Sequence, residues 1–473
     1  MQYDAVVIGA GPNGLAAAIA LAQRNLSVLV FEANSRIGGG ARTEELTLPG
    51  FRNDVCSAIH PMAASSPFFR SLPLASYGLE WIRPPFPYAH PFDDGTAAAP
   101  RESLDETMAV LREDGQQYVD LMRPFVRQRD AFFDDVLRPP HIPRHPLLLM
   151  RFGLRGRRSA ASLSSRFRSE AARSLIAGPA IHAAVPLTQA VSSALGLVMI
   201  VAAHTVGWPL ARGGSQSITD ALAAYLRSLG GVFETSRRVE SLEDLPDARA
   251  YLFDITPRQL LRIAGDHLPS LYKRRLQRFR YGPGVFKIDY ALDGPIPWRA
   301  EPCTQTATVH LGGTLEEMVD AEARVARGEH PPRPFVIVTQ PSLFDVSRAP
   351  SGKHTAWVYC HVPNSSIVDM TAAIEQQIER FAPGFRPRVL ARNARGPRDL
   401  ERENANLVGG DIAGGLTDWS QLFMRPIARL DPYSTPNEKI FLCSSSTPPG
   451  GAVHGMCGYW AAQSVLRRVF KRA

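Results

Sequence analysis

The sequence has few cysteines, and they are not arranged to pair or to bind a metal. Five cysteines are spread over 473 residues, and none forms a Cys-x-x-Cys motif. We therefore expect neither a disulfide framework nor a metal site, and a reducing, cytoplasmic location fits best. The cysteines are Cys56, Cys303, Cys360, Cys443 and Cys457.

Long apolar runs are also missing. The most apolar stretch, 194–203, is shorter than the roughly 20 residues that a spanning helix needs. A strand pattern begins at Tyr3, which leaves no room for a signal peptide. With 45% hydrophobic and 21% charged residues, we expect an ordinary globular protein of two or three domains that neither crosses a membrane nor is exported.

Several functional motifs are absent. The sequence holds no GxSxG, HExxH or GxxxxGKS motif, which leaves hydrolase, zinc protease and nucleotide triphosphatase functions without support. The formal net charge is +8, but no nucleic-acid-binding module accompanies it, so we expect no nucleic-acid partner. The positive charge is concentrated in residues 136–169, which contain eight arginines and no acidic residue.

The N-terminal residues have the pattern of a dinucleotide-binding unit. An apolar strand, 3–8, leads into the turn Gly9-Ala-Gly-Pro-Asn-Gly14, then a helix-forming run and a second strand, 26–31, that ends at Glu32. The glycines permit a tight turn and close approach of a pyrophosphate, and Glu32 can accept hydrogen bonds from a ribose while repelling a 2′-phosphate. The predicted nucleotide-binding residues here are Gly9, Gly11, Pro12, Asn13, Gly14, Glu32 and Ala33.

The segment after Glu32 indicates which dinucleotide is bound. Its sequence, Arg36-Ile-Gly-Gly-Gly-Ala-Arg-Thr43, resembles the second glycine motif of the amine oxidase and phytoene desaturase flavoproteins. The resemblance implies FAD, with backbone amides against its diphosphate and the Arg and Thr side chains at the phosphates and ribityl chain. The residues carried over are Gly39, Gly40, Ala41, Arg42 and Thr43.

Two later segments extend this resemblance. Residues 439–443 form a predicted strand, and 444–458 lead into a closing helix over 459–468. The resemblance implies that a helix N-terminus here faces the flavin pyrimidine and stabilises negative charge on the reduced ring. Many relatives end the motif in Gly-Asp, whereas Ser444-Ser445 stands here. The implied contacts are Val239 to adenine, Ser445 to the ribityl chain, and the amides of Val453, Gly455 and Met456.

These segments predict an α/β fold, a Rossmann-like flavoprotein with two dinucleotide-binding domains and a discontinuous FAD domain. The FAD domain is predicted over 1–70, 205–280 and 426–473, a helical lobe over 71–204, and a mixed-sheet substrate domain over 281–425. The layout resembles the carotenoid (phytoene) desaturase branch, through Gly207-Trp-Pro209 and Tyr281-Gly-Pro-Gly-Val-Phe-Lys287. That resemblance implies an apolar isoprenoid or lipid-like substrate, desaturated by hydride transfer to flavin N5.

The arginine-rich segment 138–168 fits peripheral docking on the inner face of a membrane, with the leucines, Met150 and Phe152 of 147–154 entering the interface. The alternative is an exposed basic face whose leucines belong to an ordinary core, with prolines interrupting any long helix. The helical lobe could equally form a homodimer surface.

The sequence offers few candidate acids or bases. His454 lies in the closing loop and His60 follows the second glycine motif, so either could carry a proton near neutral pH. The alternative for each is a histidine held by hydrogen bonds without a chemical role. For an unactivated polyene, no catalytic side chain is needed. The electron acceptor is expected to be oxygen or a quinone.

Three other functions share the FAD motifs. A flavin amine oxidase would normally carry an aromatic cage before the closing helix, but Trp419, Phe423 and Tyr433 are scattered through a proline-containing stretch. A redox-neutral isomerase would need reduced FAD and no acceptor. The alternative that is not an enzyme is an interaction protein whose flavin has a structural role.

Overall fold

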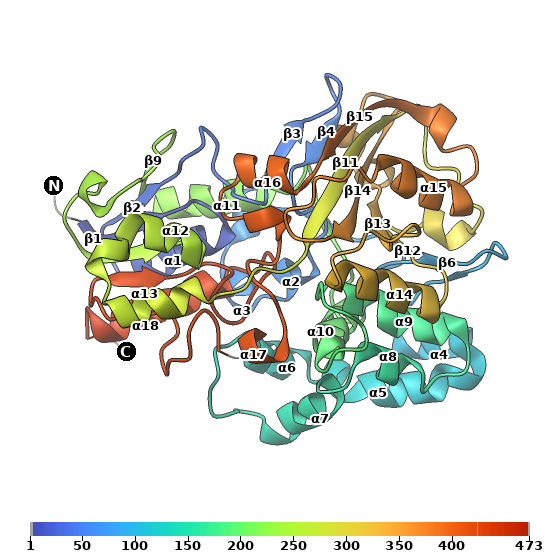
Figure 1. Cartoon of the computed structure of the whole chain (residues 1–473), viewed down its shortest axis with the longest axis horizontal. Helices are drawn as coiled ribbons and strands as arrows, with labels where there is room; N and C mark the ends of the chain where they lie inside the picture. Colours follow the sequence, from blue (N-terminus) through green and yellow to red (C-terminus); the bar gives the residue numbers. More distant parts are fainter. Residues whose placement is uncertain (1–2, 423, 472–473) are drawn as a thin grey trace.

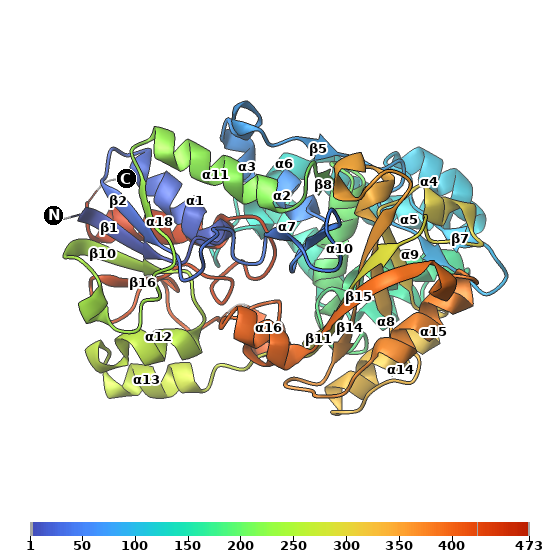
Figure 2. The same ribbon diagram turned by 90° about the horizontal axis from the view of Figure 1, so that it is seen from above.

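The structure is a computed structural model that describes residues 3–422 and 424–471. The molecule has two halves, each built on one large sheet. The first half contains a five-stranded sheet in the order β16-β10-β1-β2-β9, and every neighbouring pair of strands is parallel (Figure 2). The strands come from three distant parts of the chain, so the sheet assembles only when these parts meet. They are β1 (Tyr3–Ile8), β2 (Val28–Phe31), β9 (Val232–Glu234), β10 (Ala248–Phe253) and β16 (Ile440–Leu442).

Helices cover both faces of this parallel sheet, because its strands carry apolar side chains on both faces. On one face α1, α11 and α18 pack against the sheet, and α12 and α13 cover the other (Figure 2). The closing helix α18 lies directly on α1, because Gly458 has no side chain to separate the two helices. Their bounds are α1 (Pro12–Ala22), α11 (Gln216–Ser228), α12 (Pro257–Ala264), α13 (Ser270–Gln277) and α18 (Met456–Arg468).

The second half contains a sheet in the order β12-β13-β14-β11-β15, in which all the strand pairs are antiparallel. Parallel bridges from Phe86 to Thr306, just before β12, and from Ala89 to Val309 in β12 make the extended sheet mixed. Helix α15 covers one face, while α14 and α9 pack on the other. The bounds are β11 (Gly284–Leu292), β12 (Thr308–Leu311), β13 (Val336–Thr339), β14 (His354–Val362), β15 (Val389–Arg395), α14 (Leu315–Ala326) and α15 (Thr371–Phe381).

A lobe of helices lies beside both sheets (Figure 1). Helix α10 is buried on all sides, and it shares one apolar core with α1 of the first half. The helical segment from Gly115 to Val136 is divided at Gln128 into two helices, α5 and α6. The lobe consists of α4 (Leu104–Leu111), α5 (Gly115–Arg127), α6 (Arg129–Val136), α7 (Pro146–Gly156), α8 (Ala160–Ser164), α9 (Glu170–Ile181) and α10 (Ser192–Ala203).

The predicted fold class, an α/β Rossmann-like flavoprotein fold with a second, mixed sheet and a helical lobe, is confirmed. The exact domain boundaries stay a prediction. Shorter connecting elements are α2 (Pro61–Ser65), α3 (Pro67–Ser71), α16 (Pro397–Glu403), α17 (Trp419–Leu422), and the strands β3 (Thr43–Glu45), β4 (Arg52–Asp54), β5 (Trp81–Ile82), β6 (His90–Pro91), β7 (Ala97–Ala98) and β8 (Leu210–Ala211).

None of the helices within the described ranges is long and apolar enough to span a bilayer. All five cysteines are free thiols. Across the same residues, no group of three or more His, Cys, Asp or Glu side chains is placed to hold a metal ion.

Candidate cofactor and substrate cavity

One continuous cavity of about 440 Å³ runs from the glycine turn of the first sheet to the face of the second sheet. This volume is within the range of small-molecule and cofactor sites, roughly 300–1,000 Å³. Its nucleotide end is bordered by the ends of β1, β2 and β10, and its middle by residues 39–41, 444–446 and 451–453. Its far end is bordered by residues 56–62, α10 and the second sheet.

The glycine turn at the nucleotide end has no room for side chains. A Cβ on Gly14 would lie 1.9 Å from the carbonyl oxygen of Gly9, and one on Gly39 would lie 3.0 Å from the Cα of Gly11. Gly9 has a φ of 105°, which other residues rarely adopt. The two glycine motifs therefore pack backbone against backbone. They form a bare peptide cradle at the N-terminus of α1, where anions bind favourably.

Glu32 lies at the end of β2 and borders the cavity, as expected for an acid that binds a ribose. Its carboxylate is held by the amides of Ala10 (3.0 Å) and Asn34 (2.9 Å), one on each oxygen. The Asn34 side-chain amide also donates to Oε1, at 3.2 Å, so it is Oε2 that retains a lone pair and can still accept a hydrogen bond from a ligand. Ala33 and Val239 line the same end of the cavity.

Asp254 is a second acid at this end, and the sequence analysis did not single it out. It follows β10, and its carboxylate accepts a hydrogen bond from the amide of Gly14 at 2.9 Å. Burial raises its pKa to about 7, with a smaller contribution from nearby Glu32, while the Gly14 bond acts in the opposite direction. Because the spacing between Asp254 and the glycine turn is 240 residues, no local pattern could have revealed the contact.

The second glycine motif is only partly at the cavity. Gly39, Gly40 and Ala41 border it, but Arg42 and Thr43 do not. The Arg42 guanidinium pairs with Glu403 at 2.6 Å, and the Thr43 hydroxyl donates to Asp54 at 2.7 Å. In this structure both side chains make polar contacts within the protein, and their contacts to phosphate and ribityl groups stay a prediction.

The closing segment also divides between the cavity and the core. Ser445 and Val453 border the cavity, and the Asn13 side chain donates to the Ser445 hydroxyl at 3.4 Å, which links the opening and closing motifs. Gly455 packs tightly against Phe69, and Met456 is buried as the first residue of α18. Pro12 and Asn13 themselves line the cavity at the start of α1.

His454 is buried away from the cavity lining. Its Nδ1 accepts a hydrogen bond from the amide of Met456 at 3.0 Å, so the ring caps the start of α18. Burial lowers its pKa to about 4, which keeps the ring neutral and Nδ1 free to accept. The sequence suggested that His454 could carry a proton near neutral pH. In the structure the ring is neutral there and instead holds the closing loop.

His60 does border the cavity, and it belongs to a buried polar network. The Ser215 hydroxyl donates to the carbonyl of Ser57 at 2.5 Å, so the His60 Nε2–H must donate to Ser215, at 2.9 Å. Burial lowers the pKa of His60 to about 4. This ring is also neutral at pH 7, and it is positioned as a wall of the cavity rather than as a group that titrates near neutrality.

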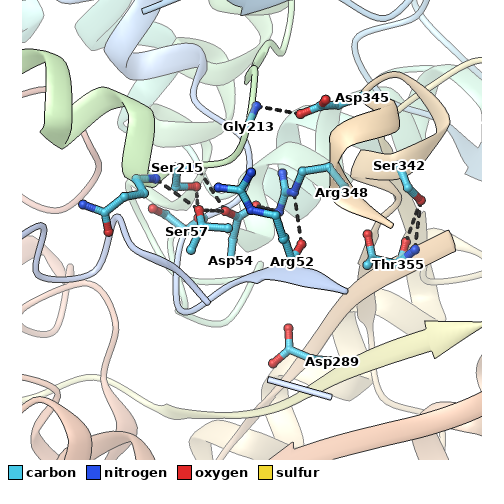
Figure 3. A network of polar contacts seen from close by, with 12 residues as sticks. Arg52, Asp54, Ser57, Gly213, Ser215, Asp289, Ser342, Asp345, Arg348 and Thr355 are labelled. Carbon is cyan, nitrogen blue, oxygen red and sulfur yellow. Dashed lines mark hydrogen bonds and ion pairs between the residues drawn. The ribbon is translucent and has the colours of Figure 1, made fainter. Parts of the chain in front are cut away.

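The network around His60 is anchored by a buried ion pair between Asp54 and Arg348, 2.7 Å apart (Figure 3). Asp54 also accepts from the amide of Ser215 at 2.9 Å, and Asp345 accepts from the amide of Gly213 at 2.7 Å. These contacts join the first half of the molecule to the second sheet. They hold the segment that carries His60 in place.

A second row of charges lies behind the cavity on the second sheet. Lys287 pairs with Asp289 at 2.5 Å, and Asp289 also pairs with Arg395 at 3.1 Å. Burial lowers the pKa of Lys287 to about 8, although the Asp289 charge opposes this. Arg395 continues to Glu403, which holds Arg42. Arg42 also pairs with Glu44 at 3.5 Å, so each charge in this row has a partner of opposite sign.

The far end of the cavity is mainly apolar. Its lining combines residues 56–62 with residues of the helical lobe and of the second sheet. Trp419 and Tyr433 do not line it, and Phe423 lies outside the described residues. The apolar lining residues include Ile59, Met62, Leu195, Met199, Trp208, Ile337 and Ile412.

Comparisons with known proteins agree with this arrangement. Residues 7–72 match the family described as NAD(P)-binding Rossmann-like domain. The chain is 27% identical to pyridine nucleotide-disulfide oxidoreductase domain-containing protein 2 of Rattus norvegicus, over 98% of this chain and 94% of the rat protein. The phytoene dehydrogenase of Streptomyces griseus is 26% identical over 86% of this chain and 80% of that protein. A solved structure of putrescine oxidase bound to putrescine has a TM-score of 0.62 at 17% identity, covering 99% of this chain and all of that chain.

Together, the fold, the glycine cradle and these similarities support an oxidoreductase of the flavoprotein superfamily. The similar proteins include a phytoene dehydrogenase and an amine oxidase. The likeness therefore does not single out the phytoene desaturases, to which the sequence motifs point.

Proposed function

We propose that this protein is an FAD-dependent oxidoreductase that dehydrogenates an apolar, isoprenoid or lipid-like substrate. The observation that carries the proposal is the single cavity that joins the glycine cradle and Glu32 to an apolar far end. A dinucleotide held in the cradle and a substrate at the far end would share one enclosed space. Electron transfer between them would then be shielded from water.

The residues at the cradle fit FAD. Gly11, Asn13 and Gly40 would hold the diphosphate through backbone amides, and Glu32 would accept from the adenosine ribose. Ser445 borders the middle of the cavity, where it would contact the ribityl chain. Bound FAD would supply the acceptor of a hydride from the substrate. The protein's own neutral walls, including His60, would orient the substrate and exclude water.

The test is anaerobic titration of the FAD-loaded protein with candidate substrates, followed by flavin absorption. We expect apolar isoprenoids to bleach the flavin and a quinone or oxygen to restore it. Bleaching by amines alone would indicate an amine oxidase. Turnover that needs dithionite and no acceptor would indicate an isomerase, and a flavin that no donor reduces would indicate a structural cofactor.

Asp254 makes FAD affinity depend on pH. Its carboxylate lies against the turn that would hold the diphosphate, so a charged Asp254 opposes the anion and a protonated one does not. Since its pKa is about 7 without ligand, we expect affinity to fall several-fold as pH rises from 6 to 8. Asp254→Asn should bind FAD more tightly at pH 8 and show a flat profile. A flat profile in the wild type, measured by flavin fluorescence titration, would contradict this account.

We further propose that α7 docks on an anionic membrane surface. Figure 1 places this helix at the edge of the helical lobe. Leu147, Met150 and Leu154 lie at helical spacing and are 69%, 55% and 53% exposed. Exposed arginines surround them, which suits anionic headgroups. The sequence had included Leu148 and Phe152 in this surface, but both pack into the lobe, because they lie on the opposite side of α7.

The docking proposal predicts a specific loss of vesicle binding. The triple variant Leu147→Glu, Met150→Glu and Leu154→Glu should reduce binding to vesicles that contain phosphatidylserine by about tenfold or more. Ile367→Glu, an equally exposed apolar position on the second half, is the matched control and should bind normally. Flotation of the FAD-loaded protein measures both. Equal binding by the triple variant and the wild type would overturn the proposal.

A further inference from the structure

The second sheet presents two chemically different faces. One face is mainly apolar and packs under α15. Because strand residues alternate between faces, the other face carries a different set of side chains, and it includes polar and aromatic ones. Thr308, Thr339 and Trp357 are paired across neighbouring strands of this face, and Tyr359 follows two positions after Trp357. All four line the far end of the cavity.

These cavity-lining groups lack hydrogen-bond partners. Tyr359 is 5% exposed and Thr339 1% exposed, and neither hydroxyl bonds to any group in the part of the chain that the structure describes. The Thr308 hydroxyl and the Trp357 indole nitrogen are also unpartnered among the described residues. Buried polar groups are nearly always hydrogen-bonded, and each one left unpaired costs about 1–3 kcal/mol. The Thr308 and Trp357 atoms are closed off from the cavity, so the Tyr359 and Thr339 hydroxyls are the groups that a ligand atom in the cavity would complete.

The patch carries no net charge that could attract an ion. Lys287 and Asp289 lie on the same face but are paired with each other. His182, which lines the cavity beside the patch, shares a hydrogen bond with His310 between their Nε2 atoms, 3.2 Å apart. Burial lowers the pKa of His182 to about 3, and it raises the pKa of Tyr359. The imidazole and phenol groups are therefore both neutral.

We propose that Tyr359 and Thr339 form a subsite that binds an uncharged oxygen of the substrate, a hydroxyl or carbonyl group on an otherwise apolar molecule. This inference rests on the proposed function, since it names the class of substrate that the cavity takes. A pure hydrocarbon would leave these hydroxyls unpaired. An ammonium or carboxylate group would lose its hydration without gaining a counter-ion.

The test compares an isoprenoid alcohol with a hydrocarbon of the same skeleton, farnesol and farnesane. Binding to the FAD-loaded protein is measured by perturbation of the flavin absorption spectrum and by displacement of a fluorescent fatty alcohol. We expect farnesol to bind at least about tenfold more tightly than farnesane, the gain of one or two buried hydrogen bonds. Tyr359→Phe and Thr339→Val should each remove most of this preference and leave farnesane binding unchanged.

Tyr290→Phe is the matched control, because Tyr290 lies in the same sheet on the opposite, apolar face. It should keep the preference for farnesol. Equal affinities of the wild type for the two ligands would overturn the inference. So would variants that lower the affinity for farnesol and for farnesane by the same factor. A protein that fails to bind FAD would instead refute the proposed function, so the two failures are distinguishable.

Discussion

Gly14→Ala should abolish FAD binding. The new Cβ would lie 1.9 Å from the carbonyl oxygen of Gly9, so the turn would have to open at the point where the diphosphate is expected. Because the obstacle is backbone, no side-chain movement relieves it. We expect FAD affinity to fall by about a hundredfold or more, which corresponds to roughly 3 kcal/mol. Fluorescence titration with FAD measures the change.

The control for this variant is Gly153→Ala. Gly153 lies inside α7, and no atom lies within 4 Å of a Cβ built there. The substitution should leave FAD affinity unchanged, and it should stabilise the helix by about 0.5–1 kcal/mol. If Gly14→Ala binds FAD as tightly as Gly153→Ala does, the glycine turn is not the cofactor cradle.

Arg348→Met should cause the largest loss of stability. Arg348 is fully buried, and it pairs with Asp54 while donating through Nε to the carbonyl of Arg52 at 3.0 Å. Removing it leaves the Asp54 carboxylate buried without its counter-ion, which typically costs about 3–5 kcal/mol. Chemical denaturation at pH 7 measures the free energy of unfolding. The double variant Asp54→Asn with Arg348→Met should recover part of the loss.

The Asp54–Arg348 pair also predicts a pH dependence. Burial raises the pKa of Asp54, but the charge of Arg348 and hydrogen bonds from Ser215 and Thr43 outweigh it, so the pKa is lowered from its usual 3.8. The stabilisation is therefore complete above that value and is lost as pH falls through the folded-state pKa. A loss in Arg348→Met of less than about 1 kcal/mol at pH 7 would contradict the structural role given to this pair.

The sequence predicted best where the signal was local. The run from Tyr3 to Glu32 contains the strand, turn, helix, strand and acid in order, and the structure has each of them at nearly the predicted positions. A mixed sheet was also predicted within residues 281–425. By contrast, β12, β15 and α14 were not, because the two strands are short or rich in arginine and their apolar faces appear only after the sheet assembles.

The site was harder to predict, because its contacts join distant parts of the chain. Arg42 was assigned to a phosphate from its motif, yet in this structure it meets Glu403, which lies 361 positions away. The bond from His60 to Ser215 spans 155 positions and fixes the ring, while burial lowers its pKa and keeps it neutral. Such side-chain contacts depend on which turns lie together in the folded molecule. A sequence motif predicts the local backbone conformation but not the distant partners of its side chains.

FAD binding by the purified protein tests the central claim most directly. The absorption spectrum before and after incubation with FAD, followed by gel filtration to remove free flavin, reports the bound cofactor. The account predicts that one FAD per chain stays with the wild type and that Gly14→Ala retains none. A wild-type protein that stays colourless after incubation would contradict it.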